Sequence, residues 1–133
     1  NAKQNGLAIE AVEADVFDFL TELDKKKDHS YDYIVLDPPA FTKSGKTVHE
    51  AFRGYKEINY RAMKILPRGG YLATCSCSHF MGEELFVKMV KEAARDAGVT
   101  LRQIEFRQQA PDHPILMTVP ETYYLKFFLF QIV

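Results

Sequence analysis

The sequence predicts an α/β protein whose sheet is mostly parallel and carries an antiparallel C-terminal strand. Three observations lead to this fold class. The apolar run Ile34-Val35-Leu36 is typical of a strand that is buried on both faces. It ends at Asp37-Pro38-Pro39, because proline lacks the N–H that the next ladder bond needs. Strand-like and helical segments then alternate, which indicates parallel strands joined by right-handed crossovers.

Composition places the chain among globular proteins. Its 133 residues suffice for one domain with a core, 47% of them are hydrophobic, and the net charge is −1. No apolar run approaches the roughly 20 residues of a membrane span, and no signal-peptide pattern is present. Two cysteines, two positions apart, do not make a disulfide framework, so we expect a cytoplasmic protein.

The N-terminal third is predicted to hold a helix end, a strand and a helix. Residues 1–6 look like the tail of a helix that ends at Gly6. Residues 9–14 alternate weakly, which indicates a short strand. Residues 16–23 have apolar side chains at helical spacing, and Asp15 is placed to be the N-cap. A polar loop then leads to the strand at 31–36.

The remainder continues the alternation. A loop without periodicity precedes a helix at 55–66, and a strand beginning at Tyr71 runs into Cys75-Ser76-Cys77-Ser78-His79. A strongly amphipathic helix follows at 85–97. The last two strands, at 101–107 and 123–132, have no helix between them and should be antiparallel. Their connecting loop has three prolines and is long enough to suggest a function.

Charge is unevenly distributed along the chain. Between residues 41 and 70 there are seven basic side chains against two acidic ones. A basic flank on a nearly neutral chain suits a phosphate-bearing substrate, and a solvated helix face explains it equally well.

Two predicted strand ends carry the reactive side chains. Asp37 follows one strand and Cys77 follows the next, and strands joined by one crossover helix are usually neighbours about 5 Å apart. Open α/β sheets bind ligands at this edge. A helix N-terminus after Cys77 would favour the thiolate, and a thiolate beside an acid indicates covalent catalysis. The alternative is that Cys75 and Cys77 are both inert core thiols.

Several segments together resemble the C-terminal part of bacterial large-subunit ribosomal RNA cytosine-C5 methyltransferases, a class I family that depends on S-adenosylmethionine. The resemblance implies a Rossmann-like class I methyltransferase sheet, and it covers nearly the whole chain. The segments that carry it are Asp15-Val16-Phe17, 31–41, 53–59, 69–78, Asp112-His113-Pro114 with Pro120-Glu121, and Tyr124-Leu125-Lys126.

The resemblance also implies roles for individual residues. Cys77 would be the nucleophile that adds to C6 of an unstacked cytosine, and Asp37 would hydrogen-bond the base. Cys75 is expected to be a packing residue. The cofactor would contact Asp15, Val16, Asp37 and Pro38, and the RNA would contact Pro39, Phe41, Lys43, Arg53, Lys56 and His113.

Each role has a structural alternative. Asp37 could be a strand-end cap, Asp15 an N-cap, and Phe41 a packing residue. The lysines and arginine could be solvated charges, and a single histidine such as His113 is more often structural.

The resemblance lacks one feature. The family has a glycine-rich strand–loop–helix for the methionine part of the cofactor, followed by an acid for the ribose, and neither is in this sequence. We therefore expect residues 1–133 to be the C-terminal part of one catalytic domain, a fragment that binds cofactor weakly by itself. The strand at 9–14 would lack its family neighbour, so we expect it to be displaced, to pair across chains or to find a neighbour outside the family pattern. Exposed sheet edges would promote self-association.

Other functions remain open at this point. Exocyclic-amino methyltransferases share Asp-Pro-Pro, but their aromatic residue follows directly, whereas Ala40 precedes Phe41 here. A guanine-modifying relative or a non-catalytic RNA-binding fragment is also compatible with the sequence. A metal site at Cys75, Cys77 and His79 is weakly supported, because a fourth ligand is not evident.

Overall fold

A four-stranded sheet forms the centre of the molecule. The computed structural model describes residues 1–41 and 45–133. The strands are β1 (Tyr33–Leu36), β2 (Tyr71–Ser76), β3 (Leu101–Arg107) and β4 (Lys126–Ile132), and they lie in the order β1-β2-β4-β3. β1 and β2 are parallel, whereas β4 is antiparallel to both β2 and β3. The predicted fold class and the predicted neighbourhood of the first two strands are thus confirmed.

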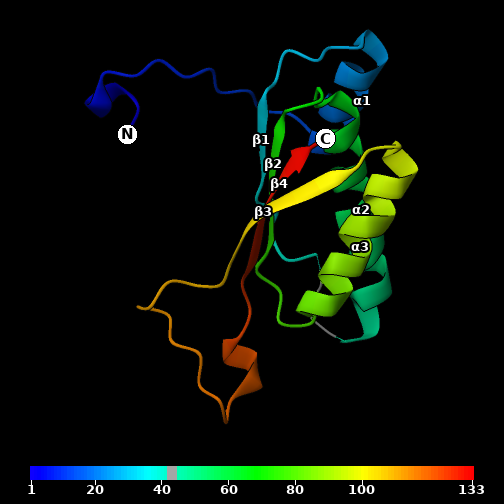
Figure 1. Ribbon diagram of the computed structural model, residues 1–133. Coiled ribbons are helices and arrows are strands. Elements are labelled where there is room, and N and C mark those ends of the chain that lie inside the picture. The colour runs from blue at the N-terminus through cyan, green and yellow to red at the C-terminus, as the bar shows by residue number, and fades with distance from the viewer. Residues whose placement is uncertain (42–44) are drawn as a thin grey trace.

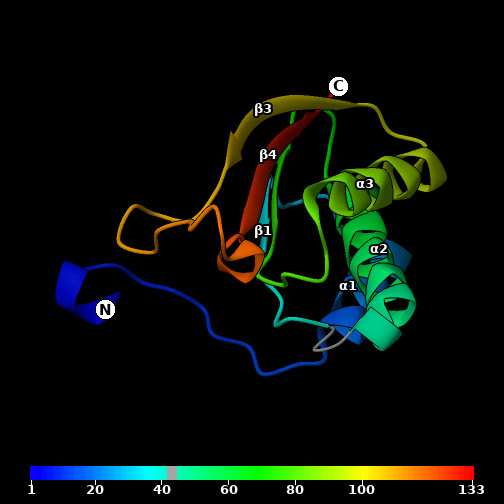
Figure 2. The same cartoon turned by 90° about the horizontal axis from the view of Figure 1, so that it is seen from below.

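Three helices cover one face of this sheet. α1 (Val16–Lys26), α2 (Val48–Ile65) and α3 (Glu83–Ala97) all lie on the same side in both views (Figures 1 and 2). Three short 3₁₀ turns, η1 (Lys3–Asn5), η2 (Gly45–Thr47) and η3 (Pro120–Thr122), complete the regular structure of the described residues. The core lies between the helices and the sheet, and its largest buried side chains include Tyr55, Phe86, Met63, Leu72 and Met89.

Local sequence explains where several elements begin and end. The predicted N-cap of α1 is confirmed, since Asp15 Oδ1 accepts hydrogen bonds from Phe17 N (2.8 Å) and Asp18 N (3.1 Å). Gly98 ends α3 in the left-handed region, at φ +71°. A Cβ on Gly70 would lie 2.9 Å from the Pro67 carbonyl oxygen, so the tight entry into β2 needs glycine.

The face of the sheet away from the helices is bare, and this corrects one prediction. β1 is not buried on both faces, because Tyr33 is 50% exposed and Val35 is 62% exposed, whereas Leu36 is only 5% exposed. Side chains alternate between the two faces of a strand. Among the described residues, helices cover only one face of the sheet (Figure 2). Leu36 belongs to the core on that face.

The N-terminal segment also departs from expectation. Residues 9–14 form no strand and are exposed, and the chain before α1 runs away from the sheet (Figures 1 and 2). The predicted displacement of this segment is confirmed, whereas its strand assignment is wrong. Weak alternation of apolar residues does not make a strand when no partner backbone completes the ladder.

Several predicted boundaries shift. α2 begins at Val48 rather than at 55, and β4 begins at Lys126 rather than at 123. β3 carries an irregularity between Gln103 and Glu105 that the sequence did not indicate. Among the described residues, no helix is long and apolar enough to cross a membrane.

Candidate functional site at the carboxyl end of the sheet

The predicted reactive residues share one edge of the sheet. β1, β2 and β3 run in the same direction and end there, and β4 begins there. Asp37 follows β1, Cys77 follows β2, and the loop from 108 to 125 leaves the same edge between β3 and β4 (Figure 1). In open α/β sheets this edge binds ligands.

A cleft of about 560 Å³ lies beside the end of β1. The start of α1 forms one wall, with Asp15 and Val16, and the exit of β1 forms the other. Six of the predicted site residues meet in this cleft, although more than twenty positions separate the first two from the other four. They are Asp15, Val16, Asp37, Pro38, Pro39 and Phe41.

Asp37 is held by a side chain that the sequence did not assign to the site. Cys75 Sγ lies 3.2 Å from Asp37 Oδ1 and 3.2 Å from the Leu36 carbonyl oxygen, and its S–H donates to these acceptors. Burial, with the neighbouring Asp37 carboxylate, raises the pKa of the Cys75 thiol to about 12. Cys75 is therefore a protonated donor that orients Asp37, rather than only a packing residue.

The strand register explains this contact. Leu36 pairs with Thr74 across the parallel ladder, so the next residue on each strand, Asp37 and Cys75, points to the same face. The pairing of Asp37 with Cys75 depends on the register of β1 against β2, which the two strand sequences do not specify by themselves.

Tyr55, on α2, connects the segments that follow β1 and end β2. Its ring is fully buried, and its hydroxyl oxygen accepts hydrogen bonds from Ser76 Oγ (3.0 Å) and from the backbone N–H of Phe41. Burial raises the pKa of Tyr55. The Phe41 ring packs edge-on against it, with centroids 4.6 Å apart. Phe41 is thus half-buried and fixed against α2. The helical spacing of Tyr55 in the sequence did not reveal that its side chain joins the ends of β1 and β2.

Cys77 lies at the edge but outside the lining of the cleft. It is exposed and its thiol is free, whereas Cys75 is buried. α3 begins six residues later, at Glu83. Of the chain's two thiols, only the one predicted to be the nucleophile is open to solvent.

Two predicted RNA contacts lie elsewhere. Arg53 and Lys56 line a separate hollow of about 420 Å³ between α2 and α3. Lys56 Nζ lies 2.7 Å from Asp96 Oδ2 and 3.4 Å from Glu92 Oε2. The hydrogen bond to Asp96 raises the pKa of Lys56 and lowers that of Asp96. In this structure Lys56 braces two helices, and it does not meet the cleft.

His113 and Lys43 complete the predicted set. His113 is exposed in the long loop, where its Nδ1 lies 2.9 Å from the Tyr124 hydroxyl and its Nε2 lies 3.9 Å from Asp112 Oδ2. Lys43 lies outside the described residues.

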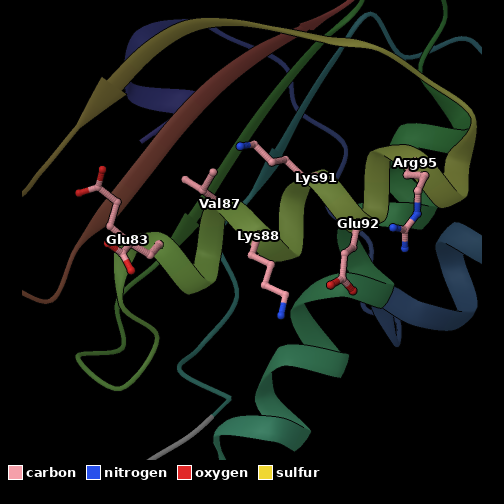
Figure 3. A pocket seen from close by; sticks show the side chains of 7 residues that line it. Glu83, Val87, Lys88, Lys91, Glu92 and Arg95 are labelled. Atoms are coloured by element: carbon pink, nitrogen blue, oxygen red, sulfur yellow. The ribbon is translucent and has the colours of Figure 1, made fainter.

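Another hollow, of about 680 Å³, lies on the outer surface of α3 (Figure 3). All of its lining residues come from α3, and they include both acidic and basic side chains. None of the predicted site residues is in it. Among the described residues, no three His, Cys, Asp or Glu side chains are grouped to hold a metal ion.

Comparison with known proteins gives a consistent family of relatives. The chain is 46% identical over 129 residues to the ribosomal RNA large subunit methyltransferase I of Aeromonas salmonicida, covering 95% of this chain and 32% of that protein. It is 45% identical over 117 residues to the protein of the same name from Pseudoalteromonas atlantica, covering 88% of this chain and 29% of that one. The chain is similar to large-subunit ribosomal RNA methyltransferases. It spans about a third of the length of these methyltransferase I relatives.

Structure comparison agrees on the fold. A proposed methyltransferase solved in complex with SAH, SMU.776, matches with a TM-score of 0.79 at 20% identity, over 98% of this chain and 34% of that chain. No family model matches the chain. The methyltransferase fold expected from the sequence is confirmed. The names of the chain's relatives include ribosomal RNA, in agreement with the resemblance.

Proposed function

We propose that this chain is the C-terminal part of the catalytic domain of a methyltransferase that modifies large-subunit ribosomal RNA and uses S-adenosylmethionine. The observation that carries the proposal is the 46% identity to a methyltransferase I relative over 95% of the chain. Because the chain spans about a third of that relative, the activity belongs to a longer polypeptide in which this sequence supplies one part of the site.

The cleft beside β1 has the chemistry for one end of the cofactor. Asp15 presents a carboxylate at the cleft wall, with one oxygen bonded to the helix N-terminus, and Val16 offers exposed apolar surface for an adenine ring. Pro38 and Asp37 form the opposite wall. The glycine-rich segment for the methionine end is not in this sequence, so we expect weak cofactor binding by the chain alone.

The finer proposal is methylation at C5 of a cytosine. The Cys77 thiolate forms a bond to C6 of a base that has left its stack, and C5 becomes nucleophilic. When bound, S-adenosylmethionine would supply the methyl group to C5 and would leave as S-adenosylhomocysteine. A base then removes the C5 proton, the bond between sulfur and C6 breaks, and the thiolate is restored. Asp37, oriented by the Cys75 thiol, would hydrogen-bond the cytosine edge.

The remaining predicted contacts follow from this arrangement. Pro39 and Phe41 line the cleft where the base would lie, and His113 is in a loop at the same edge. Arg53 and Lys43 would meet phosphates farther along the RNA, since Arg53 lies outside the cleft. Lys56 would meet one only by giving up its ion pairs with Asp96 and Glu92.

The test uses a chimaera in which this chain replaces the matching segment of the Aeromonas salmonicida relative. Transfer of labelled methyl groups from S-adenosylmethionine to unmodified large-subunit ribosomal RNA is measured, and the product nucleoside is identified. We expect 5-methylcytidine. Cys77→Ala should lower turnover by at least about 1,000-fold, because the covalent step is lost.

The second cysteine provides the comparison. Cys75→Ser keeps a donor toward Asp37 and should stay within about tenfold of the parent. Parental turnover in Cys77→Ala would contradict the covalent mechanism. A product methylated on an exocyclic amine or on guanine would identify the alternative chemistry, and a folded chimaera that binds RNA without transferring methyl groups would identify a non-catalytic RNA-binding role.

A further inference from the structure

Lys126, at the start of β4, is the most unusual charged residue of the structure. Its side chain is only 1% exposed. Its Nζ donates hydrogen bonds to the carbonyl oxygens of Ser78 (2.5 Å) and Tyr124 (2.8 Å). None of the ion pairs among residues 1–41 and 45–133 involves it. A buried ammonium group is thus held by two carbonyls and no bonded carboxylate.

Such a burial costs free energy, because an ammonium loses its hydration and two carbonyl dipoles replace it only in part. Burial lowers the pKa of Lys126 to about 8, against the opposing influence of the Cys77 thiol and the Glu83 carboxylate. The side chain still carries its proton at neutral pH. A buried cation with a shifted pKa at the predicted ligand edge is a functional candidate.

The position of Lys126 relates it to Cys77. Lys126 pairs with Ser76 across the antiparallel ladder, and the residue whose carbonyl it binds, Ser78, follows Cys77 directly. On the other side, the Ser78 N–H donates to Ser76 Oγ (3.3 Å), which in turn donates to Tyr55. The backbone on both sides of Cys77 is therefore anchored to buried side chains while its thiol is exposed.

We propose that Lys126 is a positioning residue for Cys77. It holds the Ser78 carbonyl so that the Cys77 thiol is presented at the edge of the sheet, and it places a positive charge near the sulfur as negative charge develops there. This inference rests on the proposed function only in naming a cytosine as the group that the Cys77 thiol attacks. The reactivity of the thiol is a property of this chain and needs neither cofactor nor RNA.

The test measures alkylation of each cysteine in the 133-residue chain by iodoacetamide, with peptide mapping by mass spectrometry. In this reaction the thiolate sulfur bonds the methylene carbon of the probe and iodide leaves. At pH 7 we expect Lys126→Met to slow labelling of Cys77 by about fivefold, and Lys126→Arg, which keeps the charge, to restore at least half of the rate. Lys91→Met, which removes an exposed lysine from α3, is the matched control and should leave the rate unchanged.

A pH series separates a charge effect from a packing effect. The titratable groups that face Lys126 are the Cys77 thiol beyond β2 and the Glu83 carboxylate on α3. In the loop before β4, the Tyr123 hydroxyl donates a hydrogen bond to Glu83 (2.7 Å). On β3, Arg107 donates a hydrogen bond to Glu105. The ratio of wild-type to Lys126→Met rates should be largest below pH 8 and fall above about pH 9, where Lys126 is neutral and only its hydrogen bond to the Ser78 carbonyl still distinguishes it from methionine.

Cys75 serves as an internal monitor of folding, because it is buried and its pKa is raised to about 12, so we expect it to stay unlabelled in the native chain. Equal Cys77 rates in the wild type and Lys126→Met, with Cys75 still protected, would overturn the proposal. Labelling of Cys75 together with Cys77 in Lys126→Met would show that Lys126 serves the fold alone, and would also overturn it. Failure of the chimaera to methylate RNA would instead count against the proposed function and leave these rates unaffected.

Discussion

The two faces of the sheet differ sharply, although the same four strands form both. On the helix-covered face, Leu72 and Phe128 are fully buried among α2 and α3. On the bare face, Tyr33 and Val35 of β1 are at least half exposed. The period-two alternation of a strand thus places adjacent residues of one short segment in a core and in solvent. Hydrophobicity of a strand therefore does not by itself determine how many of its faces are covered.

The candidate site takes different parts from the two faces. The covered side provides positioning, through Tyr55 and Ser76, which are buried and hydrogen-bonded to each other. The opposite side of the strand exits carries the Asp37 carboxylate and the Cys75 thiol that holds it. The bare face also has an organised polar row, in which Tyr33 stacks on Tyr71 and Tyr71 accepts a hydrogen bond from Gln131. A rigid core on one side thus supports the ligand-facing groups on the other.

The largest expected contrast between the faces is in stability. Phe86→Ala should lower the free energy of unfolding by about 3–5 kcal/mol, because Phe86 is fully buried against Tyr55 and Phe128. Val35→Ala, on the bare face, should change it by only about 0.5 kcal/mol. Urea denaturation followed by circular dichroism measures both. Similar losses in the two variants would show that the bare face is covered in solution.

This contrast also shows how far the sequence could predict the structure. The helices, the parallel β1–β2 pair and the α1 N-cap depend on periodicity, crossover rules and capping, which are local signals. The bare face was not predictable, because Tyr33-Ile34-Val35-Leu36 is hydrophobic at every position and gives no sign of which side is open. The strand assigned to residues 9–14 failed because a strand requires a partner that local sequence does not specify.

The site was predictable in part for related reasons. Asp37 and Cys77 come directly after recognisable strands, so topology alone brings them to one edge. Cys75, Tyr55 and Lys126 were missed as site residues, because their roles depend on register and on contacts between distant elements. A lysine that begins a strand ordinarily faces solvent, and nothing near Lys126 in the sequence indicates its burial.

A smaller effect on stability, at Asp15, distinguishes a helix-capping role from a cofactor-binding role. Asp15→Ala should lower the free energy of unfolding by about 1 kcal/mol, because two N–H groups of α1 lose their acceptor. Asp15→Asn keeps a capping oxygen and should stay within a few tenths of a kcal/mol of the wild type. If Asp15 also binds the cofactor, Asn in the chimaera should weaken S-adenosylmethionine binding in calorimetry without loss of stability. Equal cofactor binding in wild type and Asn would leave Asp15 with the capping role alone.

A change in assembly, with little change in stability, is expected on the bare face. β1 is an edge strand, and a hollow of about 220 Å³ runs beside it, lined largely by apolar side chains that include Phe19, Tyr33 and Val35. Unpaired edges and exposed apolar side chains favour association, so the chain should sediment with a concentration-dependent mass. Val35→Lys should shift it to the monomer while changing the free energy of unfolding by only about 0.5 kcal/mol, since a charge on an edge strand opposes pairing. Glu84→Lys adds the same side chain on α3 and should leave association unchanged. A wild-type chain that is monomeric at all concentrations would show that the polar row of the bare face is sufficient to keep it in solution alone.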